Sequence, residues 1–302
     1  MSYRDGRFFS KAKHNFLSNA GVDFKMLADD DLKAIWLESL ENGMHGLCFS
    51  LYEDGQKPSD VITPEQVKRR MNIIKPYTKW VRSFSVIEGN EHIPRVAKEN
   101  GLKTIVGAWL SDDLEVNETE IESLINLAKE GCVDIAAVGN EVLYRKDLTK
   151  EQLLEYMYRV KEAVPEIQVG YVDAYYEFSN HPEIVEASDV ILSNCYPYWE
   201  GCPIEYSLNH MQQMYYQAVR AANGKKVIIT ETGWPSRGSS LKGAVSNAEN
   251  AMKYFINTQV WSAKEEIEIF YFSSFDESWK VGAEGDVGAY WGIWDKNEKL
   301  KF

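Results

Sequence analysis

The sequence lacks an excess of positive charge. Its 302 residues include 33 Lys and Arg against 46 Asp and Glu, which gives a formal net charge of -13. A nucleic acid backbone and an anionic membrane surface both attract basic proteins, so this balance argues against either as a partner. A neutral ligand such as a sugar is compatible with the charge, although charge by itself does not select one.

Closely spaced metal ligands are also missing. The five histidines are scattered, and the four cysteines do not follow a zinc-binding spacing. We therefore expect neither a metal nor another cofactor. Cys195 and Cys202 flank an aromatic segment and are able to pair, but their spacing does not establish a disulfide.

Long hydrophobic runs are absent. No stretch has the length and apolarity of a transmembrane helix, and the N-terminus has no apolar region of the kind found in secretory signals. We expect no membrane span. No linker or change of composition divides the chain, so we expect a single domain over residues 1–302, with residues 1–43 as an N-terminal extension and helix that packs on it.

What the sequence does contain is a repeated unit of short apolar strand, loop and amphipathic helix. Eight such units in about 230 residues predict an α/β fold of the (β/α)8 TIM barrel type. The rival, an open doubly wound sheet, normally has a Gly-rich first turn, which is missing here. The predicted strands are 46–50, 80–85, 103–110, 133–139, 168–173, 190–196, 227–229 and 267–274.

The predicted helices follow these strands in turn, except at the end of the chain. No full-length helix follows the eighth strand. The helix at Leu32–Leu40, which an acidic start at Asp29 precedes and Gly43 ends, is available to cover the gap between the eighth and first strands. The other predicted helices are 63–74, 93–99, 118–129, 149–164, 182–187, 207–222 and 244–258.

Two of the predicted strands each deliver a glutamate to their C-terminal end. The fourth strand ends in Asn140-Glu141, and the seventh continues into Glu231 and a Gly-Trp-Pro turn. Strands four and seven face each other across the mouth of a TIM barrel, where such folds keep their active sites. Paired carboxylates that flank one ligand are typical of glycoside hydrolysis.

These segments resemble the motifs of glycoside hydrolase family 17, from about residue 44 to the end of the chain. That family contains β-1,3-glucan hydrolases and some β-1,3-glucan transglycosylases. Each motif alone is weak, but their order and their positions at strand ends make the set specific. The matching segments are 49–56, 138–141, 194–198, 229–235, 275–280 and 291–293.

The resemblance implies a retaining mechanism, with Glu141 as acid/base and Glu231 as nucleophile. It also implies that Glu277 and Lys280 support the site. In a retaining enzyme the two carboxyl groups lie roughly 5–5.5 Å apart. The acid has to be protonated and the nucleophile ionised, so we expect a nearby cation such as Lys280 to stabilise Glu231. The amide of Asn140 is positioned to bind a hydroxyl of the sugar.

Further residues near the strand ends complete the predicted site. Arg82 is a charge within a strand and needs a carboxylate partner, so we interpret it as an organiser of the nucleophile. Asp173, at the end of the fifth strand, is interpreted as a second supporting residue. Trp36, Trp80 and Trp109 are predicted to be core. Predicted sugar contacts are Tyr52, Tyr196, Tyr198, Trp199 and Trp234. Of these, Tyr198 and Trp199, and similarly Tyr52, fit equally well as hydrophobic anchors of their loops.

Two departures from the family pattern remove hydroxyl groups near the predicted site. Phe49 and Phe84 stand where many members carry tyrosine, which puts a substrate hydrogen bond in doubt but not the chemistry.

The sequence thus predicts a monomeric enzyme that cleaves internal bonds of a laminarin-like β-1,3-glucan. A transglycosylase shares every predicted catalytic residue, so the motifs do not separate the two. A non-catalytic glucan-binding barrel and a β-1,4-glucanase remain as further alternatives, which the two glutamates and the family motifs disfavour. Polysaccharide degradation would favour a secreted or periplasmic location, although no export signal is visible.

Overall fold

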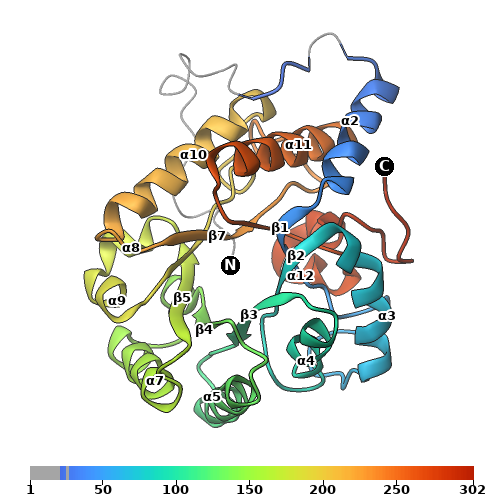
Figure 1. Ribbon diagram of the computed structural model, residues 1–302. Helices are drawn as coiled ribbons and strands as arrows, with labels where there is room; N and C mark the ends of the chain where they lie inside the picture. Colours follow the sequence, from blue (N-terminus) through green and yellow to red (C-terminus); the bar gives the residue numbers. More distant parts are fainter. Residues whose placement is uncertain (1–20, 25–26) are drawn as a thin grey trace.

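Eight parallel strands close into a barrel in chain order (Figure 1). This computed structural model describes residues 21–24 and 27–302; the rest of the predicted N-terminal extension lies outside the described residues. The (β/α)8 TIM barrel that the sequence predicts is confirmed. The strands are β1 Met44–Cys48, β2 Thr78–Arg82, β3 Lys103–Ala108, β4 Ile135–Asn140, β5 Gln168–Ala174, β6 Ile191–Asn194, β7 Val227–Thr232 and β8 Ile269–Tyr271.

Several strands end earlier than the sequence predicts. The apolar run continues to Leu110 after β3 and to Tyr196 after β6, but these residues have already left the barrel. They are buried all the same, at 0% and 3% exposure, because the loops at the C-terminal ends fold over the sheet and bury their own side chains. Burial without sheet pairing explains why hydrophobicity alone overestimates strand length.

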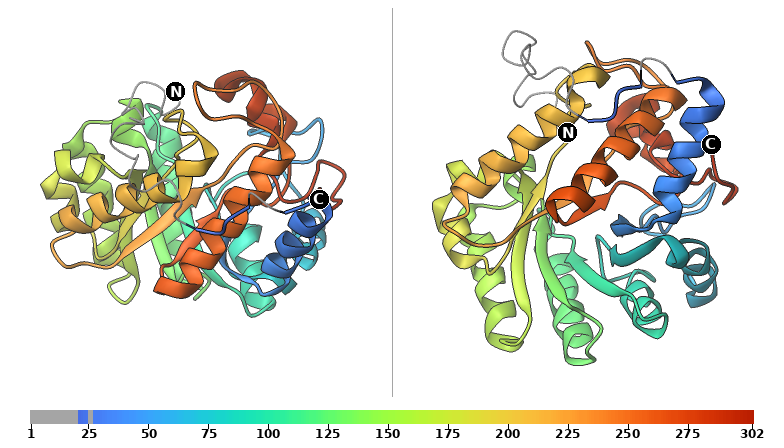
Figure 2. Two further views of the ribbon diagram at one scale, coloured as in Figure 1. Left: turned by 90° about the horizontal axis from the view of Figure 1, so that it is seen from above. Right: turned by 45° about the horizontal axis from the view of Figure 1, so that its top comes forward.

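The helices form an outer ring around the barrel (Figure 2). Local signals set several of their starts: Thr63 accepts a hydrogen bond from the backbone of Gln66 ahead of α3, and Thr149 and Gln152 form a reciprocal capping box ahead of α7. The helices are α2 Asp29–Glu41, α3 Pro64–Ile74, α4 His92–Glu99, α5 Leu114–Lys129, α6 Val142–Arg145, α7 Lys150–Ala163, α8 Glu177–Asn180, α9 Pro182–Ala187, α10 Ile204–Ala221, α11 Ala248–Glu265 and α12 Val281–Glu284, with short 3-10 turns at Lys75–Tyr77, Ser278–Lys280 and Gly285–Tyr290.

The helix that precedes β1 occupies the place where the barrel lacks a last helix. After β8 the chain forms only α12 and two 3-10 turns, on the mouth of the barrel. Helix α2 packs against α11 and the turn before β2, and Figure 1 shows it beside α11. Its Trp36 is 1% exposed, with its ring centroid 5.9 Å from that of Phe255 and 5.1 Å from that of Phe302. The outer ring is therefore completed by the N-terminal side of the chain.

The four cysteines are all free and buried, so Cys195 and Cys202 do not form a disulfide. Among residues 21–24 and 27–302, none of the helices combines the length and the apolar character needed to cross a bilayer.

We predict that Trp36→Ala destabilises the protein by about 3–5 kcal/mol, because it opens a cavity between α2, α11 and the C-terminus. Urea denaturation measures this change. Leu37→Ala, on the same helix but at a side chain that is 39% exposed, is the matched control and should change the stability by far less. Equal effects of the two substitutions would contradict the packing role of α2.

Candidate active site

The two glutamates that the sequence singles out lie at the C-terminal ends of β4 and β7. In each strand one extra residue interrupts the regular pairing just ahead of the glutamate. Such a bulge changes which face the following side chains occupy, and bulges concentrate next to active sites. Both strands of the site therefore depart from the regular barrel at the point where the chemistry would take place.

In β4 the bulge turns an amide into the barrel. Ala137 pairs with Gly170, and Asn140 pairs with Val172, so β4 has one residue more than β5 over this stretch. Gly139 lies within it at a φ of +83°, in the left-handed region that favours glycine. Regular alternation from Ala137 would place Asn140 on the outer face. The bulge instead brings its amide oxygen into the barrel.

In β7 the extra residue appears against both neighbouring strands. Ser193 pairs with Ile229 but Asn194 already pairs with Glu231, and the pairing with β8 shifts in the same interval. The Glu231 carboxylate consequently points into the mouth. Thr232 points outward, toward the hydroxyl group of Tyr254 on α11.

One amide group connects the two glutamates. The Asn194 side-chain nitrogen donates to Oε1 of Glu141 at 3.0 Å and to Oε1 of Glu231 at 3.1 Å. Its own oxygen accepts a hydrogen bond from Thr230 at 2.9 Å, which fixes the amide orientation. The Oε1 atoms of Glu141 and Glu231 are therefore at most about 6 Å apart, which is compatible with the spacing of about 5–5.5 Å between carboxyl groups in retaining glycosidases.

The cation in contact with Glu231 is Arg82. Its guanidinium donates to Oε1 of Glu231 at 2.7 Å and to Oδ1 of Asn140 at 2.7 Å, and its side chain is 1% exposed. Burial by itself would lower the pKa of Arg82, but the Glu231 carboxylate and the Cys48 thiol together outweigh it and raise this pKa above its ordinary value. Arg82 therefore has the carboxylate partner that the sequence predicts. Lys280, which the sequence suggests as a nearby cation for Glu231, bonds instead to Glu277, and Arg82 is the cation that bonds directly to Glu231.

Tyr196 completes the environment of Glu231. Its hydroxyl group donates to Oε2 at 2.8 Å, and the residue is 3% exposed. Burial and the neighbouring Glu231 carboxylate raise the pKa of Tyr196 well above its usual range, so it is a proton donor in this bond at any physiological pH. Arg82, Asn194 and Tyr196 together donate three hydrogen bonds to one carboxylate.

Lys280 instead pairs with Glu277, as part of one wall of the mouth. The two charged atoms are 2.7 Å apart, and the side chains are 12% and 4% exposed. Burial alone would lower the pKa of Lys280, yet Glu277, Glu284 and Glu231 together raise it. The Lys280 ammonium also lies 4.3 Å from the centre of the Phe272 ring. This pair is thus a buried part of the site and not a solvated surface pair.

A fourth carboxyl group, Glu284 on α12, lies near Glu141, Glu231 and Glu277 and was not identified from the sequence. Burial, opposed by Lys280 and reinforced by the charges of Glu231, Glu277 and Glu141, raises its pKa to about 7. Its position four residues after Lys280, in an irregular segment, gives no sequence signal of its own. Only the folding of α12 over the mouth brings it to the site.

The backbone at Glu141 is unusual for its residue type. Its φ is +53°, in the left-handed region, where it starts the single turn of α6. The backbone N–H of Leu143 donates to the Tyr171 hydroxyl group at 2.9 Å, and that hydroxyl group donates to Asp173. Asp173 also accepts from the backbone of Ala174 at 2.7 Å. Asp173 therefore supports the turn that carries Glu141.

Asp173 does so from outside the barrel. Asp173 is fully buried, at 0% exposure. Ala174, the next residue of β5, pairs with Asn194 and shares its inward face, so Asp173 lies on the outer face of the strand. Burial, and then the Glu141 charge, raise its pKa well above the ordinary value. The predicted supporting role fits this position, whereas direct contact with a ligand does not.

The predicted sugar contacts differ in how much surface they offer. Tyr198 and Trp234 are each 1% exposed, and both polar groups bond to backbone oxygens, of Ser239 and Val245, at 2.8 and 2.9 Å. They hold the loops after β6 and β7 and present no free face. Trp199 packs beside them, with its ring 5.3 Å from that of Trp291. For this group the anchor interpretation is the better one.

Tyr52 lies on the wall formed by Glu277. Its backbone N–H donates to Oε1 of Glu277 at 3.3 Å, and its ring meets that of Trp279 edge-on at 5.7 Å. Phe84 stacks on the Arg82 guanidinium at 4.2 Å, so this phenylalanine packs on the ion pair. Tyr52 therefore borders the mouth, and its contact with a sugar stays a prediction.

Trp109 is not a core residue, contrary to the sequence-based interpretation. It is 38% exposed, just past the end of β3, whereas Trp36 is buried as predicted and Trp80 is half-buried. Hydrophobicity could not separate these positions, because a tryptophan at the end of a strand is compatible with a core position or with the mouth.

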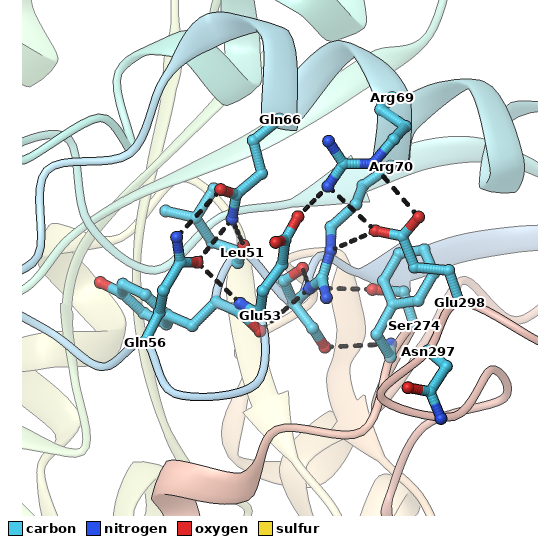
Figure 3. Close-up of polar contacts among 12 residues, drawn as sticks. Leu51, Glu53, Gln56, Gln66, Arg69, Arg70, Ser274, Asn297 and Glu298 are labelled. Carbon is cyan, nitrogen blue, oxygen red and sulfur yellow. Dashed lines mark hydrogen bonds and ion pairs between the residues drawn. The ribbon is translucent and has the colours of Figure 1, made fainter.

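A buried arginine fixes the loop that follows β1. Arg70 on α3 donates to the backbone oxygens of Ser50 at 2.9 Å and Tyr52 at 3.1 Å. Its Nε donates to Glu298 at 3.1 Å, and its guanidinium lies 4.5 Å from the centre of the Phe275 ring. Figure 3 shows Arg70 between this loop and the C-terminal segment. The position of Tyr52 thus depends on the end of the chain.

Glu120 on α5 performs a similar task for the loop after β2. Its carboxylate accepts hydrogen bonds from the Ser85 hydroxyl group and, at 3.0 Å, from the backbone N–H of Val86. Burial raises its pKa to about 7.

In residues 21–24 and 27–302, no group of three or more His, Cys, Asp or Glu side chains has an arrangement able to hold a metal ion.

The chain is similar to known glycan-processing proteins. Residues 46–292 match the BtgE/BtgC glycoside hydrolase domain. The glucan 1,3-beta-glucosidase of Schizosaccharomyces pombe is 30% identical over 252 residues, which are 76% of this chain and 77% of that protein. A Saccharomyces cerevisiae protein of the same name is 26% identical over 261 residues, covering 77% and 82% of the two chains.

The chain is also similar in fold and in sequence to a protein of known structure. The glycoside hydrolase family 17 beta-1,3-glucanosyltransferase of Rhizomucor miehei superposes with a TM-score of 0.77 at 30% identity, and the alignment covers 86% of this chain and 96% of that one.

We predict that Arg70→Lys destabilises the protein by about 2–4 kcal/mol, because a lysine has no planar fork with which to bond two backbone oxygens and Glu298. Arg69→Lys is the matched control: the neighbouring side chain is 50% exposed and its ion pairs are at the surface. Urea denaturation of both variants checks the difference. Similar losses for the two would show that the buried position has no special role.

We also predict a pH dependence of stability that arises from Glu120. Its pKa is raised from 4.5 to about 7 by folding, so the folded state holds the proton more tightly. This stability is complete below the unfolded-state pKa and is lost as the pH rises through about 7, by at most about 3 kcal/mol. Glu120→Gln should therefore flatten the fall in the free energy of unfolding over this range.

The measurement is urea denaturation at about pH 5 and about pH 8. Glu122→Gln, at an exposed position on the same helix, is the control and should keep the wild-type pH dependence. An unchanged slope in Glu120→Gln would mean that Glu120 is already ionised at low pH in the folded protein.

Proposed function

Given that the chain belongs to the BtgE/BtgC glycoside hydrolase domain family, of the family 17 type, and is a glycoside hydrolase, we propose that it cleaves internal bonds of β-1,3-glucan with retention of configuration. In this proposal Glu231 is the nucleophile and Glu141 the acid/base. Asn140, Tyr196, Glu277 and Lys280 would bind or orient the sugar. The observation that carries it is the pair of glutamates that share the amide of Asn194.

The first step is the attack of Glu231 on the anomeric carbon. One carboxylate oxygen forms a bond to this carbon while the glycosidic bond breaks, and Glu141 transfers its proton to the departing oxygen. Arg82, Asn194 and Tyr196 hold the attacking carboxylate in place, which reduces the entropy lost on the way to the transition state. The product is a covalent glycosyl-enzyme and a shortened chain.

The second step releases the sugar. Glu141, now a carboxylate, takes a proton from water, and the resulting nucleophile displaces Glu231 from the anomeric carbon. Two displacements at the same carbon restore its original configuration. The shared Asn194 amide supports this route, because two carboxylates bridged by one amide leave little room for the water that an inverting enzyme holds between them.

The arrangement of Asn140 supports a role in sugar binding. Its oxygen accepts from Arg82, so its NH2 group is the part that remains for a ligand, and in the described part of the chain no acceptor is bonded to it. A hydroxyl next to the anomeric carbon is a suitable partner, since Asn140 directly precedes Glu141. This hydrogen bond would strengthen as charge develops on the sugar ring.

The substrate assignment rests on the relatives. Two of them, at 26% and 30% identity, are named glucan 1,3-beta-glucosidase. The Rhizomucor miehei neighbour is a beta-1,3-glucanosyltransferase, which favours transfer to a second sugar as the alternative outcome for the glycosyl-enzyme. Transfer and hydrolysis use the same first step and differ only in the acceptor of the second.

We predict that Glu231→Gln and Glu141→Gln each lower kcat/KM on linear β-1,3-glucan by about 10²–10⁴-fold or more, because each removes a group that acts in the transition state. A timed product profile, with the anomer of the first product followed by NMR, is the measurement. Wild-type protein should yield a ladder of oligosaccharides in the β configuration from the start of the reaction.

Glu162→Gln, at an exposed position on α7, is the control and should behave as the wild type. A single small product would indicate exo action, and products longer than an oligosaccharide donor would indicate transfer. An α-anomer as first product, or full activity of Glu231→Gln, would refute the proposed mechanism.

A further inference from the structure

We propose that Trp109, held by Arg145, is a binding platform for an additional glucosyl unit of the substrate, on the β3–β4 side of the barrel mouth. The inference rests on the proposed function, and it adds a place where a chain longer than the minimal substrate gains affinity. It follows from the position, exposure and fixation of one tryptophan.

The sheet register places Trp109 on the same side as the catalytic groups. Ile105 pairs with Arg82, and paired residues of parallel strands share a face. Arg82 points into the barrel, toward Glu231. Alternation from Ile105 through Gly107 brings position 109 to the inner face again, now above the end of β3. Trp109 itself lies just past the end of β3, and its contact with Arg145, which also bonds to the Asn140 backbone, places the indole ring near the mouth.

The exposure of Trp109 sets it apart from most aromatic residues of the mouth. Tyr196, Tyr198, Trp199, Trp234 and Trp291 are all at most 5% exposed, whereas Trp109 is 38% exposed. Within the described residues no acceptor is bonded to its indole nitrogen, which leaves this N–H to a ligand. A large apolar surface of this kind, kept open at the edge of an active site, is typical of a binding contact.

Arg145 holds the ring in place. Its guanidinium lies 4.5 Å from the centre of the Trp109 ring. The same guanidinium donates to Asp147 at 2.7 Å, to the backbone oxygen of Leu110 at 2.7 Å and to the backbone oxygen of Asn140. A fixed aromatic ring loses little conformational entropy when a ligand binds to it.

The connection through Arg145 also locates the platform. Arg145 contacts both the Trp109 ring and the backbone of Asn140, the residue before Glu141. A sugar on the indole would thus be close to the units that the two glutamates flank. A β-linked glucosyl ring suits this surface, because its equatorial hydroxyl groups leave flat C–H faces that stack on an aromatic ring, while its hydroxyl edge can accept from the indole N–H.

The test compares substrates of different length. We expect Trp109→Ala to lower kcat/KM by about tenfold, equivalent to about 1.4 kcal/mol, on long β-1,3-linked glucose oligosaccharides and on the polysaccharide. The shortest oligosaccharide that the wild type cleaves should be almost unaffected, because it does not reach the platform. Trp109→Phe should retain most of the activity on long substrates, since it keeps an aromatic face.

Tyr158→Ala is the control for loss of an exposed aromatic side chain. Tyr158 is 54% exposed on α7, and the variant should match the wild type at every chain length. Thermal denaturation of all variants confirms that they are folded at the assay temperature.

Four outcomes are distinguishable. A loss restricted to long chains supports the platform. An equal loss at all lengths, carried by kcat, would mean that Trp109 acts only through Arg145 and Asn140, and it would overturn the proposal, as would no loss at any length. Absence of wild-type activity on every β-1,3-glucan would refute the proposed substrate instead, independently of Trp109.

Discussion

The site depends on a buried charge that has to be neutralised inside the barrel. Arg82 is almost completely removed from water, and a guanidinium in that position is tolerated only with a carboxylate and further acceptors around it. Glu231 and the amide oxygen of Asn140 supply these acceptors at 2.7 Å each. Because one guanidinium joins the ends of β4 and β7 from a third strand, β2, the two halves of the candidate site have a fixed relation before any sugar arrives.

The bulges in β4 and β7 direct the partners of Arg82 toward it. A regular barrel would direct Asn140 to the outer face, away from Arg82. The extra residue in each strand re-aims the polar side chains toward the axis. The left-handed backbone at Glu141 adds to this departure from regular geometry, and hydrogen bonds through Tyr171 and Asp173 support it from the outside of the barrel.

Around this centre, the walls of the mouth are made by segments that come from opposite ends of the chain. The loop after β1 is held by Arg70, which itself bonds to Glu298 near the C-terminus. The segment after β8, which forms no long helix, folds over the mouth and contributes Glu277, Lys280 and Glu284. Helix α2 covers the barrel where a helix after β8 would otherwise pack. The segment after β8 can therefore fold over the mouth and contribute side chains to the site.

The sequence by itself determined the barrel and its two central glutamates, because both depend on patterns that are local: apolar strands at regular spacing, and a carboxylate directly after two of them. It also indicated that Arg82 needs a carboxylate. The tertiary structure alone decided that Arg82 and not Lys280 contacts Glu231, and that Glu284 joins the site. It also decided that the Trp109 side chain is exposed to solvent while that of Trp234 is buried. These outcomes depend on bulges and on loop packing, which bring together residues far apart in the chain and leave no periodic signal in it.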